Sequence, residues 1–255
     1  MQNQIGFRRN IYRTWLDAAA ALCVETRDSA ELRVRLDPIV ADHVESVENR
    51  RTTIGILLHI WHNSTSRSSA LHEEAQHLFA QSQTATDRLW LHYGLTLLAY
   101  DFFRINSVII GQLTRYNNGV TPKQMKQRLI AEIGQRGGLD KAVDRIVSSL
   151  RDWGIFIDAG ERYTYGPPIP RLQTNNRAIE LWLLRAALTA HPAEEISFAD
   201  LIRLPELFPF RFTVTVDDLR TSPTFEVQRQ GISWDMVRLT DEPQKLQPIS
   251  QMPMI

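Results

Sequence analysis

The sequence predicts a mainly α-helical protein: a helical bundle that contains helix-turn-helix or winged-helix modules with short β-hairpin wings. Three observations predict this class. Apolar residues recur every three or four positions along much of the chain, which is the spacing of a half-buried helix. Stretches typical of strands are short and flank glycine-containing turns. Apolar residues make up 43% of the 255 residues, enough for one large or two modest cores.

The composition excludes several other classes of protein. Lys and Arg number 29, as do Asp and Glu, so the net charge of this apolar-rich chain is zero and a disordered chain is excluded. The single cysteine, Cys23, allows neither an internal disulfide framework nor a cysteine-based zinc site. Since the first residues do not resemble a signal peptide and no apolar run reaches about 20 residues, we expect a cytoplasmic protein without a membrane span.

Residues 1–83 are expected to form an N-terminal helical region with a helix-turn-helix. Asn10 is placed to cap the first helix, and Asp37-Pro38 is expected to end the second, because proline fits the first turn of a new helix. The polar run 48–53 is expected to be the turn before a longer apolar helix. The helices expected here cover residues 11–25, 29–36, 39–47, 54–61 and 67–83.

Residues 84–166 are expected to contain central helices and a winged helix. The most apolar stretch, 89–113, is expected to form two helices broken near residues 104–107. Thr121 followed by Pro122 is typical of a helix start, and Gly134 of a helix end. Helices over 123–133 and 139–153 and strands over 155–157 and 162–165 complete the order of a winged helix.

Residues 166–170 contain three prolines and predict a domain boundary. Residues 171–240 repeat the order of the preceding module and predict a C-terminal winged-helix-like domain. Its expected elements are helices over 177–191, 198–203 and 216–219 and strands over 225–229 and 234–239. Residues 241–255, which include three more prolines, are expected to be a flexible tail or to bind a partner.

The zero net charge is an average over unlike segments. Residues 104–151 have nine basic and three acidic side chains, a net charge of +6, whereas residues 1–103 and 152–255 have net charges of −2 and −4. The basic segment coincides with the first winged helix. Of the 29 basic residues, 25 are arginine, whose planar fork suits phosphates and guanine edges. Codon usage combined with ordinary surface ion pairs is an alternative explanation of this bias.

A winged helix places the N-terminal part of its second helix in the major groove and uses the preceding helix and the wing on the DNA backbone. Asp140 and Asp144 lie on the same second helix and oppose such a role. The alternative is a basic face that only meets solvent or a protein. The candidate DNA-binding residues are Lys123, Lys126, Gln135, Arg136, Lys141, Arg145, Ser148 and Arg162, with Arg50 and Arg51 as secondary candidates.

Catalytic and metal-binding patterns are missing from the sequence. It has no phosphate-binding P-loop, dinucleotide fingerprint or nucleophile elbow. His72 and His77 are five residues apart, so at about 100° per residue their side chains diverge by roughly 140° and cannot share a zinc ion. We therefore expect no metal, no cofactor and no enzymatic activity.

Three segments resemble the BrxA-type accessory proteins of bacteriophage-exclusion systems. They are Arg50-Arg51-Thr52-Thr53 at a helix start, Tyr100-Asp101-Phe102-Phe103 in the apolar centre, and the stretch from Thr121-Pro122 to Phe156. The resemblance covers about residues 30–160 and lies in the order of the elements. It implies a bacterial, DNA-associated protein without catalytic activity, of this family or a related defence-associated winged-helix family.

Two functions are therefore expected from the sequence. The first is non-catalytic binding of double-stranded DNA within a bacterial phage-defence or DNA-processing complex that contains other protein subunits; self-association is left open. The alternative is a winged-helix adaptor that scaffolds protein partners in a chromosome-organising or defence complex without reading DNA. The acidic flanks, the proline-containing tail and the apolar Phe208-Pro209-Phe210 segment support this alternative.

Overall fold

A computed structural model describes residues 7–63, 65, 68–117, 119–231 and 234–240; the expected tail lies outside these residues. The described part confirms the mainly helical class with short antiparallel hairpins. Its helices are α1 (Arg13–Glu25), α2 (Ser29–Ala41), α3 (Val47–Trp61), α4 (Ser69–Gln81), α5 (Ala85–Ala99), α6 (Asp101–Thr114), α7 (Pro122–Ile133), α8 (Leu139–Asp152), α9 (Arg177–Ala190), α10 (Phe198–Leu201), the 3-10 turn η1 (Pro205–Leu207) and α11 (Val216–Thr221). Its strands are β1 (Ile157–Asp158), β2 (Tyr165–Gly166), β3 (Glu195–Ser197), β4 (Phe225–Gln230) and β5 (Trp234–Leu239).

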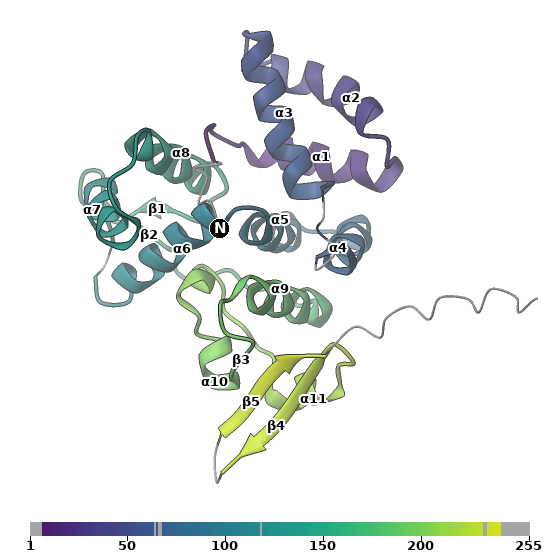
Figure 1. Cartoon of the computed structure of the whole chain (residues 1–255), viewed down its shortest axis with the longest axis vertical. Coiled ribbons are helices and arrows are strands. Elements are labelled where there is room, and N and C mark those ends of the chain that lie inside the picture. Colours follow the sequence, from purple (N-terminus) through teal and green to yellow (C-terminus); the bar gives the residue numbers. More distant parts are fainter. Residues whose placement is uncertain (1–6, 64, 66–67, 118, 232–233, 241–255) are drawn as a thin grey trace, which may run out of the picture.

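Helix α5 lies in the middle of the molecule (Figure 1), where its residues Leu89–Leu97 are buried. Helices α1, α2 and α3 lie above it in this view, α4 lies to the right, α7 and α8 lie to the left, and α9 packs against it from below. Buried apolar side chains from all three expected segments, 1–83, 84–166 and 171–240, form one continuous core. The C-terminal segment is thus attached to the rest of the molecule through packing of α9 on α5 and of η1 on α6.

The start of α1 differs from the prediction. The helix begins at Arg13, and Asn10 is not its cap. The preceding residues are extended instead, because their backbone bonds to α8: the Ile11 N–H donates to Ser149 Oγ at 2.9 Å, and Trp153 Nε1 donates to the Ile11 carbonyl at 2.8 Å. This docking places an N-terminal segment, residues 7–12, beside the first winged helix.

The turn between α2 and α3 also differs from the prediction. Helix α2 continues through Pro38 to Ala41. Proline removes the hydrogen bond to the carbonyl of Val34, but this residue is exposed, so water can replace the lost donor. Helix α3 begins at Val47, with Ser46 as its cap, so the expected turn at 48–53 is wrong and those residues are helical.

The break in the apolar centre lies between α5 and α6, at Tyr100, rather than near residues 104–107. Asn106 and Ser107 are buried inside α6. Asn106 Nδ2 donates to the Phe102 carbonyl one turn earlier, at 2.7 Å, so a polar side chain within the helix satisfies part of its hydrogen-bonding capacity without breaking it.

Two winged helices with the same topology follow. The first contains, in chain order, α6, a one-residue bridge at Val120, α7, α8, β1 and β2. Val120 pairs with Tyr165 of β2. The second contains, in chain order, α9, β3, α10, η1, α11, β4 and β5, and its sheet order is β3-β5-β4. In both sheets the last strand pairs with the other two. Each of the two segments therefore has helices followed by an antiparallel hairpin.

The two winged helices meet where η1 packs on α6. Glu206 of η1 is only 2% exposed, its carbonyl accepts a 2.6 Å hydrogen bond from the Tyr93 hydroxyl, and its Oε1 has no partner among the described residues. Burial raises the pKa of the Glu206 carboxyl group, against a smaller lowering by Arg104 and His191. This junction therefore contains a carboxyl group whose pKa is higher than that of an exposed glutamate.

We expect Glu206→Gln to weaken the pH dependence of stability. Because the pKa of Glu206 is higher in the folded chain, its stabilising contribution is complete below its ordinary pKa of 4.5 and is lost as the pH rises through the folded value. Urea unfolding measured across this range should show the wild type losing stability relative to the variant as the pH rises. If the stabilities of the wild type and the variant change with pH in parallel, the Glu206 carboxyl group does not titrate in this pH range.

Candidate nucleic-acid interface

Local sequence determines the two helices that present the candidate interface. Thr121 and Gln124 form a reciprocal capping box at the start of α7, with Pro122 as the first helical residue. Gly134 and Gly138, with φ of +78° and +80°, allow the tight turn into α8. The start of α8 is therefore held at a defined angle to α7, as a helix-turn-helix requires.

Helix α8 is sharply divided into two faces. Its apolar residues, from Leu139 to Leu150 at three-and-four spacing, are buried. Lys141, Arg145 and Ser148, three of the predicted DNA-binding residues, lie on the opposite face and are exposed. A helix with this division offers one polar stripe to a partner.

Lys126 does not lie where the sequence prediction put it. Its Nζ atom is 2.9 Å from Oδ1 of Asp144 and 4.0 Å from Oδ1 of Asp140, and its side chain is only 24% exposed. The lysine thus bridges α7 and α8 rather than reaching out toward a phosphate. The close ion pair offsets the charge of Asp144, one of the two carboxylates that opposed DNA binding by α8.

The remaining predicted residues of the first winged helix lie on its exposed parts. Lys123 is exposed in the first turn of α7, and Gln135 and Arg136 are exposed in the turn, where Arg136 Nε donates to the Ile133 carbonyl. Arg162 of the wing donates to the Tyr163 hydroxyl at 3.0 Å, and its guanidinium lies 4.9 Å from the centre of that ring.

Tyr163 is a wing residue that sequence reasoning missed. It has a φ of +59° and its side chain is 60% exposed. A tyrosine with positive φ is uncommon and points to a constrained turn. The sequence signal was the Arg162-Tyr163 pair itself, since an arginine and an aromatic ring together suit contacts to a nucleic-acid backbone or base.

The secondary candidates Arg50 and Arg51 lie on α3 and not on the winged helix. Arg50 Nε donates to Asp37 Oδ1 at 3.0 Å, and its Nη1 donates to the Glu45 carbonyl at 2.7 Å. These bonds hold the turn between α2 and α3. Arg51 is exposed. The structure therefore gives Arg50 a position inside the N-terminal helices and does not bring it together with the α8 residues.

The N-terminal segment (residues 7–12) places Arg8 and Arg9 near α8, which sequence reasoning also missed. Arg145 Nη1 donates to Asn10 Oδ1 at 3.3 Å, and the Arg13 N–H donates to Asp152 Oδ2 at 2.6 Å. The cluster Arg8-Arg9 was visible in the sequence. Its position was not, because it depends on contacts with residues about 135 positions later in the chain.

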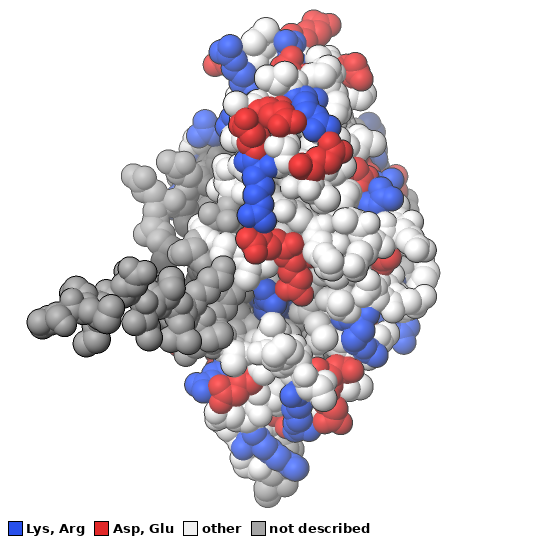
Figure 2. All heavy atoms as spheres, turned by 90° about the vertical axis from the view of Figure 1, so that its right-hand side faces the viewer, with Lys and Arg blue, Asp and Glu red and all other residues white. Residues whose placement is uncertain are grey.

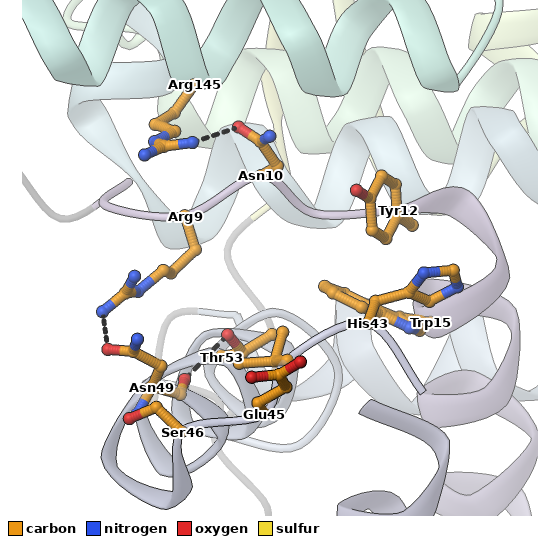
Figure 3. Close-up of a pocket in the computed structure, with 11 residues that line it drawn as sticks. Arg9, Asn10, Tyr12, Trp15, His43, Glu45, Ser46, Asn49, Thr53 and Arg145 are labelled. Atoms are coloured by element: carbon orange, nitrogen blue, oxygen red, sulfur yellow. Dashed lines mark hydrogen bonds between the residues drawn. The ribbon is translucent and has the colours of Figure 1, made fainter. Parts of the chain in front are cut away.

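A cleft of about 480 Å³ opens between this segment, α8 and the start of α3 (Figure 3). Polar side chains dominate its walls, and Figure 3 shows Arg9 reaching Asn49 while Arg145 reaches Asn10. The lining residues are Arg9, Asn10, Tyr12, Trp15, His43, Val44, Glu45, Ser46, Asn49, Thr53 and Arg145. The cleft thus shares Arg145 with the exposed face of α8.

The side of the molecule turned away from α7 and α8 has a different surface. Figure 2 shows basic and acidic side chains interspersed over that face. Ion pairs of the N-terminal helices and α9, such as Arg35 with Glu25 at 2.5 Å and Arg185 with Glu74 at 2.7 Å, match this mixed pattern. Mixed pairs of this kind are typical of an ordinary solvated surface.

The second winged helix presents a different second helix. Helix α11 has only six residues, and two of them, Asp217 and Asp218, are acidic. Arg220 is paired with Asp217 at 2.7 Å and with Asp235 of β5 at 2.6 Å. On the hairpin, Trp234 is 59% exposed. This module offers a short, charge-paired helix and an exposed aromatic ring rather than a basic stripe.

The buried His92 forms internal hydrogen bonds through both ring nitrogens. Trp61 Nε1 donates to Nδ1 of the fully buried His92 at 3.1 Å, which leaves Nε2–H to donate to Asp17 Oδ1 at 3.2 Å. Burial lowers the pKa of His92, against a raising effect of Asp17. Over the described ranges, no three His, Cys, Asp or Glu side chains are grouped so that they could hold a metal ion.

Comparison with known proteins gives no relative: the chain matches no protein-family model, no curated protein and no solved structure. Similarity to BrxA-type proteins therefore stays a prediction from the order of elements. Among the residues that the structure describes, no helix combines the length and apolar character that crossing a bilayer requires.

Proposed function

We propose that this protein binds double-stranded DNA through α8 of its first winged helix and catalyses no reaction. Lys141 and Arg145 carry the proposal. Both are exposed, and neither forms an ion pair with a carboxylate in the described part of the chain, while Lys126 neutralises the neighbouring Asp144. The free positive charge on α8 is thus available to phosphates and base edges.

Docking of the N-terminal segment supports an orientation in which the N-terminal half of α8 faces the DNA. The C-terminal half of α8 is covered where Ser149 bonds to Ile11 and Asp152 bonds to Arg13. Its N-terminal half stays open, and this half enters the major groove in winged-helix complexes. Lys123 and the Arg162-Tyr163 pair would then contact the backbone on either side. We place such a protein in the cytoplasm, within a bacterial phage-defence or DNA-processing complex.

Fluorescence anisotropy with a labelled duplex across a salt series tests the proposal. Changing Lys141 and Arg145 together to Ala should weaken binding about tenfold or more and reduce the slope of log affinity against log salt by about 2, because each phosphate contact contributes about 0.9. The control is the double variant Arg27→Ala with Arg33→Ala, which removes two exposed charges from the N-terminal helices. This control should bind the duplex with nearly the affinity and salt slope of the wild type.

Two results would contradict the proposal at different levels. Absence of duplex binding by the wild type at low salt would exclude DNA as the partner. Equal affinity and salt slope for the α8 variant and the control would leave DNA binding intact but exclude α8 as its site.

A protein partner is the second candidate, and the second winged helix favours it. Its α11 is acidic and the one arginine of this helix, Arg220, is paired with two carboxylates, so α11 offers no basic stripe to DNA. The exposed Trp234 on β5 is the type of residue that anchors protein interfaces. An adaptor function would use this module, with or without DNA at the first one.

A further inference from the structure

The cleft between the N-terminal segment, α3 and α8 is large enough for a small molecule. Its volume of about 480 Å³ lies within the range of small-molecule sites, about 300–1,000 Å³. Three separate parts of the chain build it: residues 9–15, residues 43–53 and Arg145 of α8. Figure 3 shows the polar groups of these parts arranged around one space.

Two positive charges at this cleft have no carboxylate partner among the described residues. Arg9 Nη2 donates to Asn49 Oδ1, and Arg145 Nη1 donates to Asn10 Oδ1 at 3.3 Å. Amide oxygens orient a guanidinium without neutralising it. Arg9 Nε is buried and lacks a hydrogen-bond partner within the described ranges, which is uncommon for a buried donor. By contrast, Arg50 and Arg185 are paired with carboxylates. The two guanidinium groups therefore suit a phosphate.

The other wall of the cleft is aromatic. The rings of Tyr12 and His43 lie 5.2 Å apart, and Tyr12 packs edge-on against the buried Trp15 at 4.5 Å. Trp15 holds Tyr12 in place, and Tyr12 and His43 are partly open to the cleft. Ring faces of this kind stack on nucleobases.

Hydrogen-bonding groups between these walls narrow the ligand class. Glu45 also lines the cleft, and its carboxylate would repel a bare anion. A nucleobase, in contrast, has N–H groups that a carboxylate accepts, and the amides of Asn10 and Asn49 both donate and accept. A ligand with an anionic end and an N–H-bearing aromatic end fits these groups better than a simple anion does.

We propose that the cleft binds one nucleotide, with its phosphate at Arg9 and Arg145 and its base against Tyr12 and His43. The nucleotide has two sources, a free mononucleotide or an unpaired nucleotide of a DNA strand held on α8. For the second source the inference rests on the proposed function, because Arg145 belongs to both surfaces.

Isothermal titration calorimetry with the four deoxynucleoside monophosphates, and with inorganic phosphate in parallel, tests the cleft without duplex DNA. At least one mononucleotide should bind with a Kd below about 1 mM and more tightly than phosphate does. Arg9→Gln should weaken binding about tenfold. Arg33→Gln, a matched change at an exposed arginine of α2 outside the cleft, should leave it unchanged. Arg145→Gln, at an exposed position, provides the same test if Arg9→Gln fails to fold.

A second titration separates the two sources. A duplex with one unpaired terminal nucleotide is compared with the blunt duplex, using the wild type and Arg9→Gln. Tighter binding of the overhang that depends on Arg9 identifies the strand as the source. Mononucleotide binding with no overhang effect identifies the free nucleotide.

Three results would overturn the cleft proposal. The first is that no mononucleotide binds and the overhang has no effect. The second is that both arginine variants still bind the mononucleotide, and the third is that phosphate binds as tightly as every mononucleotide.

Failure of the proposed function gives a different set of results. If the blunt duplex does not bind but a mononucleotide does, the DNA proposal fails and the cleft proposal stands. If the duplex binds through Lys141 and Arg145 but Arg9→Gln changes the result of neither nucleotide assay, the DNA proposal stands and the cleft proposal fails.

Discussion

Replacing Gly111 with alanine is expected to destabilise the folded protein by about 3 kcal/mol or more, since inserting atoms into a packed contact typically costs about 1–3 kcal/mol and more where nothing can yield. Gly111 lies in α6 where η1 crosses it. A Cβ atom at this position would lie 1.9 Å from the Pro205 carbonyl oxygen, 2.5 Å from its carbonyl carbon and 2.9 Å from its Cα.

Three features of this contact make the effect large. All three neighbouring atoms belong to the backbone, so no side-chain rotation can relieve the overlap. The next residue, Glu206, is itself fixed by the hydrogen bond from the Tyr93 hydroxyl to its carbonyl. The contact also joins the first winged helix to the second, so η1 must move away from α6 and expose part of the shared core.

The same substitution at Gly55 is the matched control. Gly55 lies in the middle of α3, and a Cβ atom there would have no heavy atom within 4 Å. Alanine favours a helix by roughly 0.5–1 kcal/mol over glycine, so Gly55→Ala should be neutral or stabilising. Urea unfolding of both variants measures the difference. Equal midpoints for the two variants would mean that η1 does not pack on α6 at this point.

Local signals made the first winged helix predictable. The start of α7 is encoded by Thr121, Pro122 and Gln124 within four residues, and the glycine turn and the amphipathic pattern of α8 follow directly. Where a similar signal was absent, the prediction failed. At the turn 42–46 the cap residue Ser46 was a single signal, and the residues on both sides of it are polar and charged.

Long-range contacts explain what sequence reasoning could not predict about the candidate site. Residues 7–12 would cap or extend α1 on local grounds, but Ser149 and Trp153 of a distant segment bind the backbone of Ile11 instead. Similarly, Lys126 is basic and lies on the exposed side of α7 by spacing, yet the crossing of α8 places Asp144 against it. The cleft combines three segments, so no pattern within one segment indicates it.

Replacing Glu180 with alanine is expected to cost about 1–3 kcal/mol, the range for removing the buried acceptor of several hydrogen bonds. Glu180 of α9 is 1% exposed. Its carboxylate accepts hydrogen bonds from the Thr213 N–H at 3.0 Å, from the Thr213 hydroxyl at 3.1 Å and from Arg177 Nη1 at 3.2 Å. Alanine would leave the Thr213 donors without their acceptor and would open a cavity beside α9.

Thr213 lies two residues before Thr215, whose side chain caps α11, so the loss should loosen the second helix of the C-terminal winged helix in particular. Glu180→Gln keeps an oxygen that can accept from Thr213 but loses the charge facing Arg177. The free energy of unfolding of this variant should therefore lie between those of Glu180→Ala and the wild type. Glu226→Ala is the control, because Glu226 lies on exposed β4 in a surface pair with Arg238 and should change stability little. Urea unfolding gives the free energies, and hydrogen exchange at the Thr213 amide reports the local effect. An unfolding midpoint for Glu180→Ala equal to that of Glu226→Ala would mean that α9 does not hold the loop before α11 through this carboxylate.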